Sequence, residues 1–498
     1  MTTARTDNRP VRVRLAPSPT GDPHVGMIRQ AIWTWLYARH NNGTFILRIE
    51  DTDQTRLVEG AVGRIMDSLR WLGIDWDEGP DIGGDYGPYV QSERRALYQE
   101  AANRLLADGN AYRCFATVEE LKALREGQQA RKEPPRYDGR YRDFPVAEAE
   151  ARAAAGDPFV IRFRIPLEGS TTFNDLLRGD ITFENKQLDD FVILKSDGLP
   201  TYHLAHVVDD TAMEITHVTR GEEWLPSAPR HVQLFNALGY AQPIWVHAPI
   251  ILGPDGGKLS KRHSAKFVLE YADEGYLPAA LFNFLSITGW ALDDHTEIFT
   301  RERLIEVFDL ADLSKNPSGF DDTKLEWMNG VYMREMPEDE LVDVFRQRLE
   351  LDLAPDIARP LDEALIEEFT PLVRERLKLL AELAPLVEFF FRSDVPTPPN
   401  ENFLVKKWKN RGDDASAVLA ALAKFLEPID PWTTEEIEAA MRAAAEEIEI
   451  RAGDLFALVR LAITGTRISP PLFESMAIVG KGLSIERLEA AATQLGSS

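Results

Sequence analysis

A rigid turn ahead of the first helical segment carries the first residues that could do chemistry. The stretch "RLAPSPTGDPHVGM" spans residues 14–27, and His24 and Gly26 stand where the helical pattern begins. Backbone N–H groups at a helix N-terminus attract anions, and a glycine lets a ligand approach the backbone closely. His24 could donate a hydrogen bond to a phosphate oxygen, and Ser18 adds a hydroxyl. On its own, a polar residue at a helix start is more often a cap than a ligand.

A second candidate phosphate site lies far along the chain. The loop "GGKLSKRH", residues 256–263, places Lys258 and Lys261 three positions apart with Ser260 between them. Lysines on such a loop can stabilise the charge that develops on a leaving pyrophosphate. The stretch is not a P-loop, because the pattern Gly-x-x-x-x-Gly-Lys-Ser/Thr does not occur. Taken alone, it could equally be an exposed basic turn.

The elements around the first turn have the pattern of a parallel α/β sheet. Residues 11–17 are typical of a strand, apolar residues then recur at helical spacing, and "TFILRIED" at 44–51 is again strand-like. We expect Gly43 to end the helix in the left-handed conformation. Strand, helix and strand in this order form a βαβ unit with parallel strands.

The rest of the chain changes character twice. The block 111–190 mixes a basic loop with strand patterns and is typical of an insertion. Sheet structure is expected again over 189–210 and 215–225. Beyond Pro337, long patterns of Ala, Leu and Glu predict an all-helical C-terminal third.

The composition excludes several classes of protein. A chain of 498 residues with 44% hydrophobic and 28% charged residues is expected to form several soluble domains. No apolar run could span a bilayer and no secretory signal opens the sequence, so we expect a cytoplasmic protein without membrane contact. The single cysteine, Cys114, excludes an internal disulfide and a Cys-x-x-Cys metal site.

The charge is strongly acidic overall and unevenly distributed. A formal net charge of −25 argues at first against a nucleic-acid partner, because phosphate binding draws on Lys and Arg. Four local basic segments interrupt the acidic chain, at 131–142, 258–266, 374–378 and 405–412. Each alone is more typical of a solvated charged face.

The two candidate phosphate loops together resemble the nucleotide-binding motifs of class I aminoacyl-tRNA synthetases, usually written HIGH and KMSKS. Here they are "HVGM" at 24–27 and "KLSKR" at 258–262. Met27 replaces the second histidine of the family motif, which removes one contact to ATP. Further segments are similar to the bacterial-type glutamyl-tRNA synthetases: "RIEDTD" (48–53), "YGPYVQSER" (86–94), "PTYHLAHVVDD" (200–210), "VTRGEEWL" (218–225) and "FDDTKLEWMNGVYMR" (320–334).

The resemblance implies a fold with several parts. We expect an α/β Rossmann-like catalytic domain with a parallel sheet, made of residues 11–95 and 190–255. An inserted α+β domain, 96–189, would bind the tRNA acceptor end, and 256–335 would carry the KLSKR loop and contact the stem. An all-α region, 336–498, would bind the anticodon.

The resemblance also implies a reaction. ATP and L-glutamate would form glutamyl-adenylate and pyrophosphate, and transfer to tRNA(Glu) would then release AMP. Mg²⁺ would bridge the phosphates, and the nucleophile would belong to the substrate, so catalysis would depend on positioning and charge stabilisation. The catalytic residues would be His24, Gly26, Lys258 and Lys261, with Ser18 and Ser260 as further ATP-binding residues.

A glutamate pocket is expected at the carboxyl ends of adjacent strands, where open α/β sheets bind ligands. Arginine matches a carboxylate with two parallel N–H groups. Arg14 and Arg220 stand where the family places such groups, so the resemblance implies that they hold the glutamate side chain, with the Tyr202 hydroxyl. Glu50 would bind the ammonium group, and the family pattern adds Ala16 and Ser18. Singly, each of these could be an ordinary ion-pair or core residue.

Other assignments stay open or carry less support. His206 fits the substrate pocket and a buried core position equally well, and Trp224 could flank the adenosine or simply pack. Asp209 and Asp210 could pair with basic residues, and neither is given a catalytic role. Arg376 is the family-based candidate for reading the last anticodon base. Because Cys114 is alone, we expect no zinc, and we expect a monomer.

Three rival functions remain at this point. A glutaminyl-tRNA synthetase shares the nucleotide motifs, but its C-terminal part is a β-barrel, whereas 435–450 is helical in pattern. A non-discriminating enzyme would also charge tRNA(Gln). A tRNA-binding regulator without catalysis would have no reason to keep both phosphate motifs.

Overall fold

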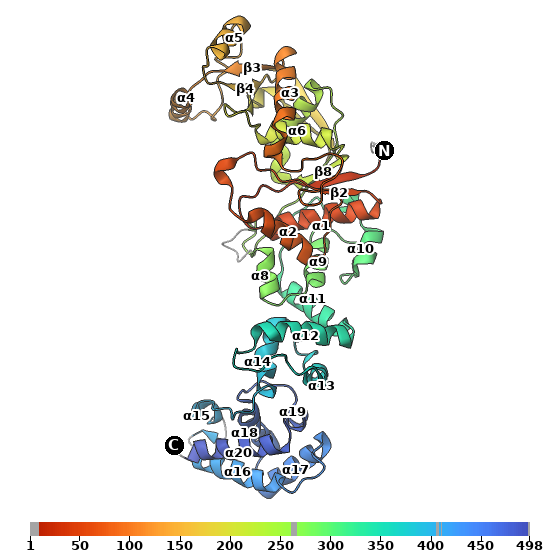
Figure 1. The fold of residues 1–498 in the computed structure, drawn as a ribbon, viewed down its shortest axis with the longest axis vertical. Coiled ribbons are helices and arrows are strands. Elements are labelled where there is room, and N and C mark those ends of the chain that lie inside the picture. Colours follow the sequence, from red (N-terminus) through yellow and green to blue (C-terminus); the bar gives the residue numbers. More distant parts are fainter. Residues whose placement is uncertain (1–8, 260–265, 405–407, 410, 497–498) are drawn as a thin grey trace. The chain divides into compact units, whose positions relative to one another are not determined.

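The computed structural model describes residues 9–259, 266–404, 408–409 and 411–496 (Figure 1). The chain divides into two compact units. The first unit comprises Met1–Tyr271 and Leu281–Asp321, and the second comprises Ala272–Ala280 and Asp322–Ser498.

The N-terminal strands and helix form the expected βαβ unit. Strand β1 (Arg12–Leu15) pairs in parallel with β2 (Thr44–Leu47), and helix α1 (Val25–His40) connects them. Val13 and Phe45 face each other in this pairing and are fully buried. The βαβ unit therefore sets where the turn at 16–24 leaves the sheet and enters the helix.

The end of α1 differs from the expectation. Asn42, with a φ of 49°, takes the left-handed conformation that we assigned to Gly43, whose φ lies outside that region. Glycine is needed at 43 for another reason, since a Cβ there would lie 2.4 Å from the carbonyl oxygen of Val11. Glycine at 43 therefore allows the segment after α1 to pack closely against Val11, the residue that precedes β1.

A second group of strands extends the core. The order is β6-β5-β9-β8, formed by β6 (Gly179–Glu184), β5 (Ser170–Asp175), β9 (Ile244–Ala248) and β8 (His217–Gly221). Strands β8 and β5 both run parallel to β9, whereas β5 and β6 are antiparallel. The backbone N–H of Thr216 donates to the carbonyl of Arg12 (2.9 Å), which connects the segment before β8 to β1.

The pairing of β5 with β9 has a consequence for the site. Both β5 and β6 lie within 96–189, the range expected to be the insertion, yet Asp175 of β5 pairs with Trp245 of β9. Asp175 is thereby brought against the neighbouring His247 on β9. A residue from this range thus reaches the core sheet.

The segment 189–210 contains a helix that the sequence pattern did not predict. Strand β7 (Val192–Leu194) is short, and α6 (Tyr202–Ala212) follows where more sheet was expected. Polar residues of α6, His206, Asp209 and Asp210, are as buried as its apolar ones. A short, mostly apolar run of this kind fits a buried strand as well as a buried helix, so its pattern does not decide between the two.

The first unit contains further strands and helices. Strands β3, β4 and β7 form a separate antiparallel sheet. The bounds are α2 (Ala61–Trp71), α3 (Arg95–Ala107), β3 (Ala111–Cys114), α4 (Val118–Ala130), α5 (Val146–Ala154), β4 (Val160–Phe163), α7 (Ala228–Ala237), β10 (Ile251–Leu252), α10 (Arg301–Val307) and β11 (Ser318–Gly319), with α8 (Val268–Asp273) and α9 (Pro278–Ile287) at the boundary of the two units.

The regular elements of the second unit are all helices among the described residues, as predicted for the C-terminal third. Two buried clusters hold it together, one around Phe345 and Phe369 and another around Leu419, Met441 and Leu458. Its helices are α11 (Asp322–Glu335), α12 (Glu338–Asp352), α13 (Glu363–Val373), α14 (Leu383–Val387), α15 (Asn400–Phe403), α16 (Gly412–Leu426), α17 (Thr434–Glu447), α18 (Ala452–Thr464), α19 (Leu472–Val479) and α20 (Lys481–Gly496).

Across the described parts of both units, no helix combines the length and the apolar character that crossing a membrane requires.

Candidate active site

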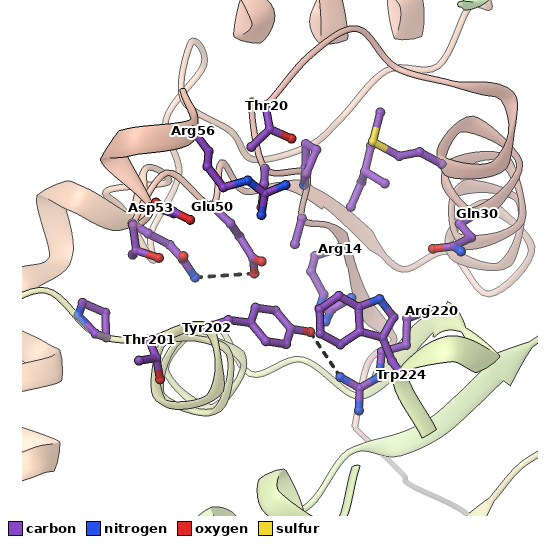
Figure 2. A pocket seen from close by; sticks show the side chains of 18 of the residues that line it. Arg14, Thr20, Gln30, Glu50, Asp53, Arg56, Thr201, Tyr202, Arg220 and Trp224 are labelled. Atoms are coloured by element: carbon purple, nitrogen blue, oxygen red, sulfur yellow. Dashed lines mark hydrogen bonds between the residues drawn. The ribbon is translucent and has the colours of Figure 1, made fainter. Parts of the chain in front are cut away.

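Two neighbouring pockets open at the start of α1. The first, of about 650 Å³, lies between the ends of β1 and β2 and the start of α6, and Figure 2 shows its side chains. The second, of about 490 Å³, lies beside the turn at residues 20–27 and the segment 249–251. Six residues line both pockets: Ser18, Thr20, His24, Met27, Gln30 and Glu223. Groups bound in the two pockets would therefore meet at the N-terminus of α1.

His24 is both a helix cap and a lining residue of both pockets. Its Nδ1 accepts hydrogen bonds from the backbone N–H groups of Gly26 (3.1 Å) and Met27 (3.3 Å). Desolvation, followed by the nearby Lys258 ammonium, lowers the pKa of His24, so the imidazole is neutral at pH 7. Because Nδ1 accepts, Nε2 carries the proton and can donate.

The absence of a side chain at Gly26 leaves room for the His24 ring. A Cβ on Gly26 would lie 3.1 Å from both Cε1 and Nδ1 of the imidazole. A side chain at position 26 would therefore require the ring to shift by a few tenths of an ångström.

Lys258 lies near His24 with its charge already paired. Its Nζ contacts a carboxylate oxygen of Glu223 at 2.6 Å, and both side chains reach solvent. A phosphate entering the second pocket would therefore compete with Glu223 for this lysine. Ser260 and Lys261, the other loop residues predicted to bind ATP, lie outside the described residues.

Arg220 is buried at the first pocket without a carboxylate partner among the described residues. Its Nε donates to His247 Nε2 (3.1 Å) and its Nη1 to the Tyr202 hydroxyl (3.2 Å), and Nη2 lies 3.1 Å from His231 Nδ1. The residue as a whole is 5% exposed and lines the pocket. Burial lowers the pKa of Arg220 from its ordinary value, which reflects a desolvated cation.

Arg14 differs from Arg220 because its charge is balanced. Its Nε and Nη2 donate to the two carboxylate oxygens of Asp210 at 3.0 and 3.2 Å, and Arg48 contacts the same carboxylate at 2.7 Å. Desolvation opposes the charge of Asp210, but the two arginines outweigh it and hold its pKa well below the usual range. Asp210 does pair with basic residues, as the sequence allowed.

Glu50 lies between this ion-pair network and the pocket. Its Oε1 accepts hydrogen bonds from Arg48 Nη2 (3.1 Å) and Gln91 Nε2 (3.4 Å), the second of which Figure 2 draws. Desolvation is the largest influence and raises the pKa of Glu50 to about 7, although Arg48 and Arg14 act in the opposite direction. The carboxylate is therefore close to its titration point at neutral pH.

Asp209 supports the floor of the pocket from α6. Its carboxylate accepts from Arg94 Nε (2.6 Å), Gln91 Nε2 (2.8 Å) and the Tyr98 hydroxyl (2.8 Å). Gln91 was not among the predicted site residues, although it lines the first pocket and contacts Glu50. Its position in the segment "YVQSER" was the available signal.

The other predicted pocket residues divide into two groups. Tyr202, Ala16 and Ser18 line the first pocket, and so does Trp224, whose ring lies 4.6 Å from that of Tyr202. His206 is fully buried and does not line that pocket; its ring stacks on Tyr202 and its Nδ1 lies 2.9 Å from Asp210. Its geometry matches the core alternative.

Arg376 is exposed in the second unit. Its Nη1 donates to the carbonyl of Ser469 at 3.1 Å, and Arg460 Nη1 donates to the same oxygen at 3.4 Å. The Arg376 cation also lowers the pKa of Arg460, after desolvation. The guanidinium groups of Arg376 and Arg460 therefore share one backbone carbonyl as their acceptor.

Among the residues that the structure describes, no group of three or more His, Cys, Asp or Glu side chains could hold a metal ion.

Comparison with known proteins places this geometry in a family. Residues 10–327 match the family model described as tRNA synthetases class I (E and Q), catalytic domain, and residues 340–492 match an anticodon binding domain. A glutamate–tRNA ligase of Dehalococcoides mccartyi is 50% identical over 485 residues, covering 97% of this chain and 98% of the relative. One from a Roseiflexus species is 45% identical, covering 98% and 97%.

A solved structure is similar over nearly the same length. The glutamate tRNA ligase of Elizabethkingia meningosepticum, in complex with its amino acid, has a TM-score of 0.87 and 34% sequence identity. The match covers 98% of this chain and 100% of that one.

Proposed function

The chain belongs to the glutamate–tRNA ligases, which are class I aminoacyl-tRNA synthetases, and we propose that it joins L-glutamate to tRNA(Glu) in two steps. In the first, a glutamate α-carboxylate oxygen attacks the α-phosphorus of ATP, and the bond to the bridging oxygen breaks to release pyrophosphate. In the second, a ribose hydroxyl of the tRNA 3′ end attacks the adenylate carbonyl, and AMP leaves.

The second pocket supplies the groups for the phosphates. His24 Nε2–H would donate to a phosphate oxygen, and the positive end of the α1 dipole would favour the phosphate charge, while the N–H groups of Gly26 and Met27 stay bonded to His24 Nδ1. Lys258 would leave Glu223 and follow the developing charge, together with Lys261. Mg²⁺ bound to ATP would offset further phosphate charge.

The first pocket supplies the groups for the amino acid, and Arg220 is the observation that carries the proposal. A buried arginine with three uncharged partners gains a counter-ion when a carboxylate binds. Glutamine would present a neutral amide instead. The NH₂ group of that amide would face an N–H group of Arg220, and two donors cannot form a hydrogen bond. Glu50, in its charged form, would hold the substrate ammonium.

The macromolecular assignments rest on the family. Residues 96–189 would bind the acceptor end and 256–335 the stem, with residues 11–95 and 190–255 as the catalytic domain. The region 336–498 would bind the anticodon, with Arg376 as a reader. We propose a cytoplasmic monomer without bound zinc.

Aminoacylation of separately purified tRNA(Glu) and tRNA(Gln) tests the proposal. We expect labelled glutamate, and not glutamine, to be attached to tRNA(Glu), with AMP released. Attachment of glutamate to both tRNAs would show a non-discriminating enzyme. Attachment of glutamine, or no attachment at all, would contradict the proposal.

A further inference from the structure

Three histidines and one aspartate surround the buried face of Arg220. His247 lies on β9, His231 on α7 and His203 on α6, and Asp175 ends β5. We call these four residues the histidine frame. His203 and His231 were not predicted to belong to the site, and neither were the other two.

The first arm of the frame fixes the tautomer of His247. Asp175 Oδ2 accepts from the His247 backbone N–H at 3.0 Å and lies 2.8 Å from its Nδ1. A carboxylate can only accept, so Nδ1 carries the proton and Nε2 presents its lone pair to Arg220 Nε. Desolvation, the largest influence, lowers the pKa of His247, which keeps the ring neutral.

The second arm does the same for His231. Its Nδ1 faces Arg220 Nη2 at 3.1 Å, and its Nε2 lies 2.9 Å from His203 Nδ1. Arg220 has only donors, so Nδ1 of His231 must accept and Nε2 carries the proton toward His203. Desolvation and then the Arg220 charge lower the pKa of His231 well below its usual value.

Together the two arms and Tyr202 leave a defined part of Arg220 available. A guanidinium has five N–H groups, and the three contacts use one each on Nε, Nη1 and Nη2. One N–H remains on each of Nη1 and Nη2. Two N–H groups on neighbouring nitrogens are the arrangement that binds a carboxylate through both oxygens.

The groups that contact Arg220 directly carry no charge. Arg14 and Arg48 each already contact a carboxylate, that of Asp210, and Arg48 contacts Glu50 as well. Asp175 does not contact Arg220 directly, because His247 lies between them. The frame therefore orients the guanidinium without neutralising it.

We propose that the histidine frame positions Arg220 for the side-chain carboxylate of glutamate and thereby sets the preference for an acidic over an amide side chain. The inference rests on the proposed function, because it assigns the specificity of that same pocket. His247, His231, His203 and Asp175 are positioning residues, since they act through Arg220.

A metal site is the alternative that a group of histidines suggests. The lone pairs of His247 Nε2 and His231 Nδ1 are, however, already directed at Arg220. A metal ion bound to these two nitrogens would take the place of the guanidinium N–H groups and would be repelled by the nearby positive charge of Arg220. The frame is therefore built around the arginine.

Paired substitutions at His247 and His231 test the frame. His247→Leu and His231→Leu remove an acceptor for Arg220, whereas His247→Gln and His231→Asn can place a side-chain oxygen in that position. We expect each leucine variant to raise KM for glutamate roughly tenfold or more, while KM for ATP stays constant. The Gln and Asn variants should recover most of this loss. The glutamate-over-glutamine preference should fall with the leucine variants only.

Asp175 tests whether the effect passes through His247. Asp175→Asn alone should raise KM for glutamate. In a His247→Gln background the same change should have little further effect, because there is no longer a histidine tautomer at 247 for Asp175 to fix. Asp180→Asn on the neighbouring strand β6 removes an equal charge at an exposed position and serves as the control. Equal effects of the two Asp→Asn changes would contradict the inference.

Calorimetric titration of L-glutamate into the full-length protein separates the two levels of the proposal. If the wild type charges neither tRNA but its glutamate binding depends on His247, the frame stands and the proposed function falls. Equal glutamate binding by the wild type and by folded His247→Leu would overturn the frame. So would losses of glutamate and ATP affinity in the same proportion.

Discussion

At the scale of single residues, Glu50 should make glutamate binding sensitive to pH. Burial raises the pKa of Glu50 to about 7, and only the charged carboxylate can pair with the substrate ammonium. As the pH falls through 7, Glu50 takes up a proton, so kcat/KM for glutamate should fall, approaching about tenfold per pH unit. Steady-state charging kinetics between pH 6 and pH 8 measure this.

The substitution Glu50→Gln provides the control for this profile. It should raise KM for glutamate and flatten the pH dependence, since the titrating group is gone. The effect on stability has a definite sign: a raised carboxyl pKa means that charged Glu50 costs folding free energy above pH 7 and that this cost is relieved at lower pH. An unchanged pH profile in Glu50→Gln would assign the titration to another group.

Single residues also show what sequence reasoning can reach. Four pocket residues could be named from the sequence because each lies in a family motif: Arg14, Glu50, Tyr202 and Arg220. All four line the first pocket. Asp175 carried no such signal: its role exists only because β5 pairs with β9, which brings residues 175 and 247 together. Contacts of this kind depend on tertiary pairing that a local pattern does not contain.

At the scale of elements, helix α1 joins stability to catalysis through His24. The side chain caps the helix through Nδ1 and offers Nε2–H to the phosphates. His24→Asn should keep a cap, because Asn is among the best capping residues, but lose the imidazole donor. We expect a normal unfolding midpoint and a charging rate lowered by roughly 10²-fold.

His24→Ala removes both functions and completes the comparison. It should lower the free energy of unfolding by about 1 kcal/mol. It should slow charging about as much as His24→Asn does. Chemical denaturation and pyrophosphate exchange measure the two effects separately. If Asn and Ala were equally active and the wild type no faster, the imidazole would be a cap alone.

Elements were predictable where one face is polar and another apolar, or where a turn residue marks the end. The βαβ unit is bounded by the proline-rich turn before α1 and by the turn at 41–43 after it, whereas α6 is a short apolar run that fits a buried strand equally well. The end of α1 shows a related limit. A glycine near a helix end suggested a left-handed residue, whereas the structure uses Gly43 for close packing and Asn42 for the turn.

At the scale of the whole molecule, the acidic chain must bind tRNA through local positive charge. The net charge is −25, yet the basic segment 131–142 is partly neutralised by its own neighbours. Arg131 pairs with Glu133 at 2.8 Å and Arg140 with Asp138 at 2.7 Å. Fewer cations are thus available to phosphates than the composition suggests.

Glu133→Gln should therefore strengthen tRNA binding, because it releases the Arg131 side chain to contact phosphate. Each added phosphate contact steepens the dependence of log affinity on log salt concentration by about 0.7 to 0.9. KM for tRNA measured at several NaCl concentrations should show a lower value and a steeper slope, with KM for ATP unchanged. Glu148→Gln, on helix α5, changes the net charge equally but has no arginine partner among the described residues, so it should shift KM without steepening the slope. Identical slopes for the two variants would mean that Arg131 does not meet the tRNA backbone and that the acceptor end binds elsewhere on this chain.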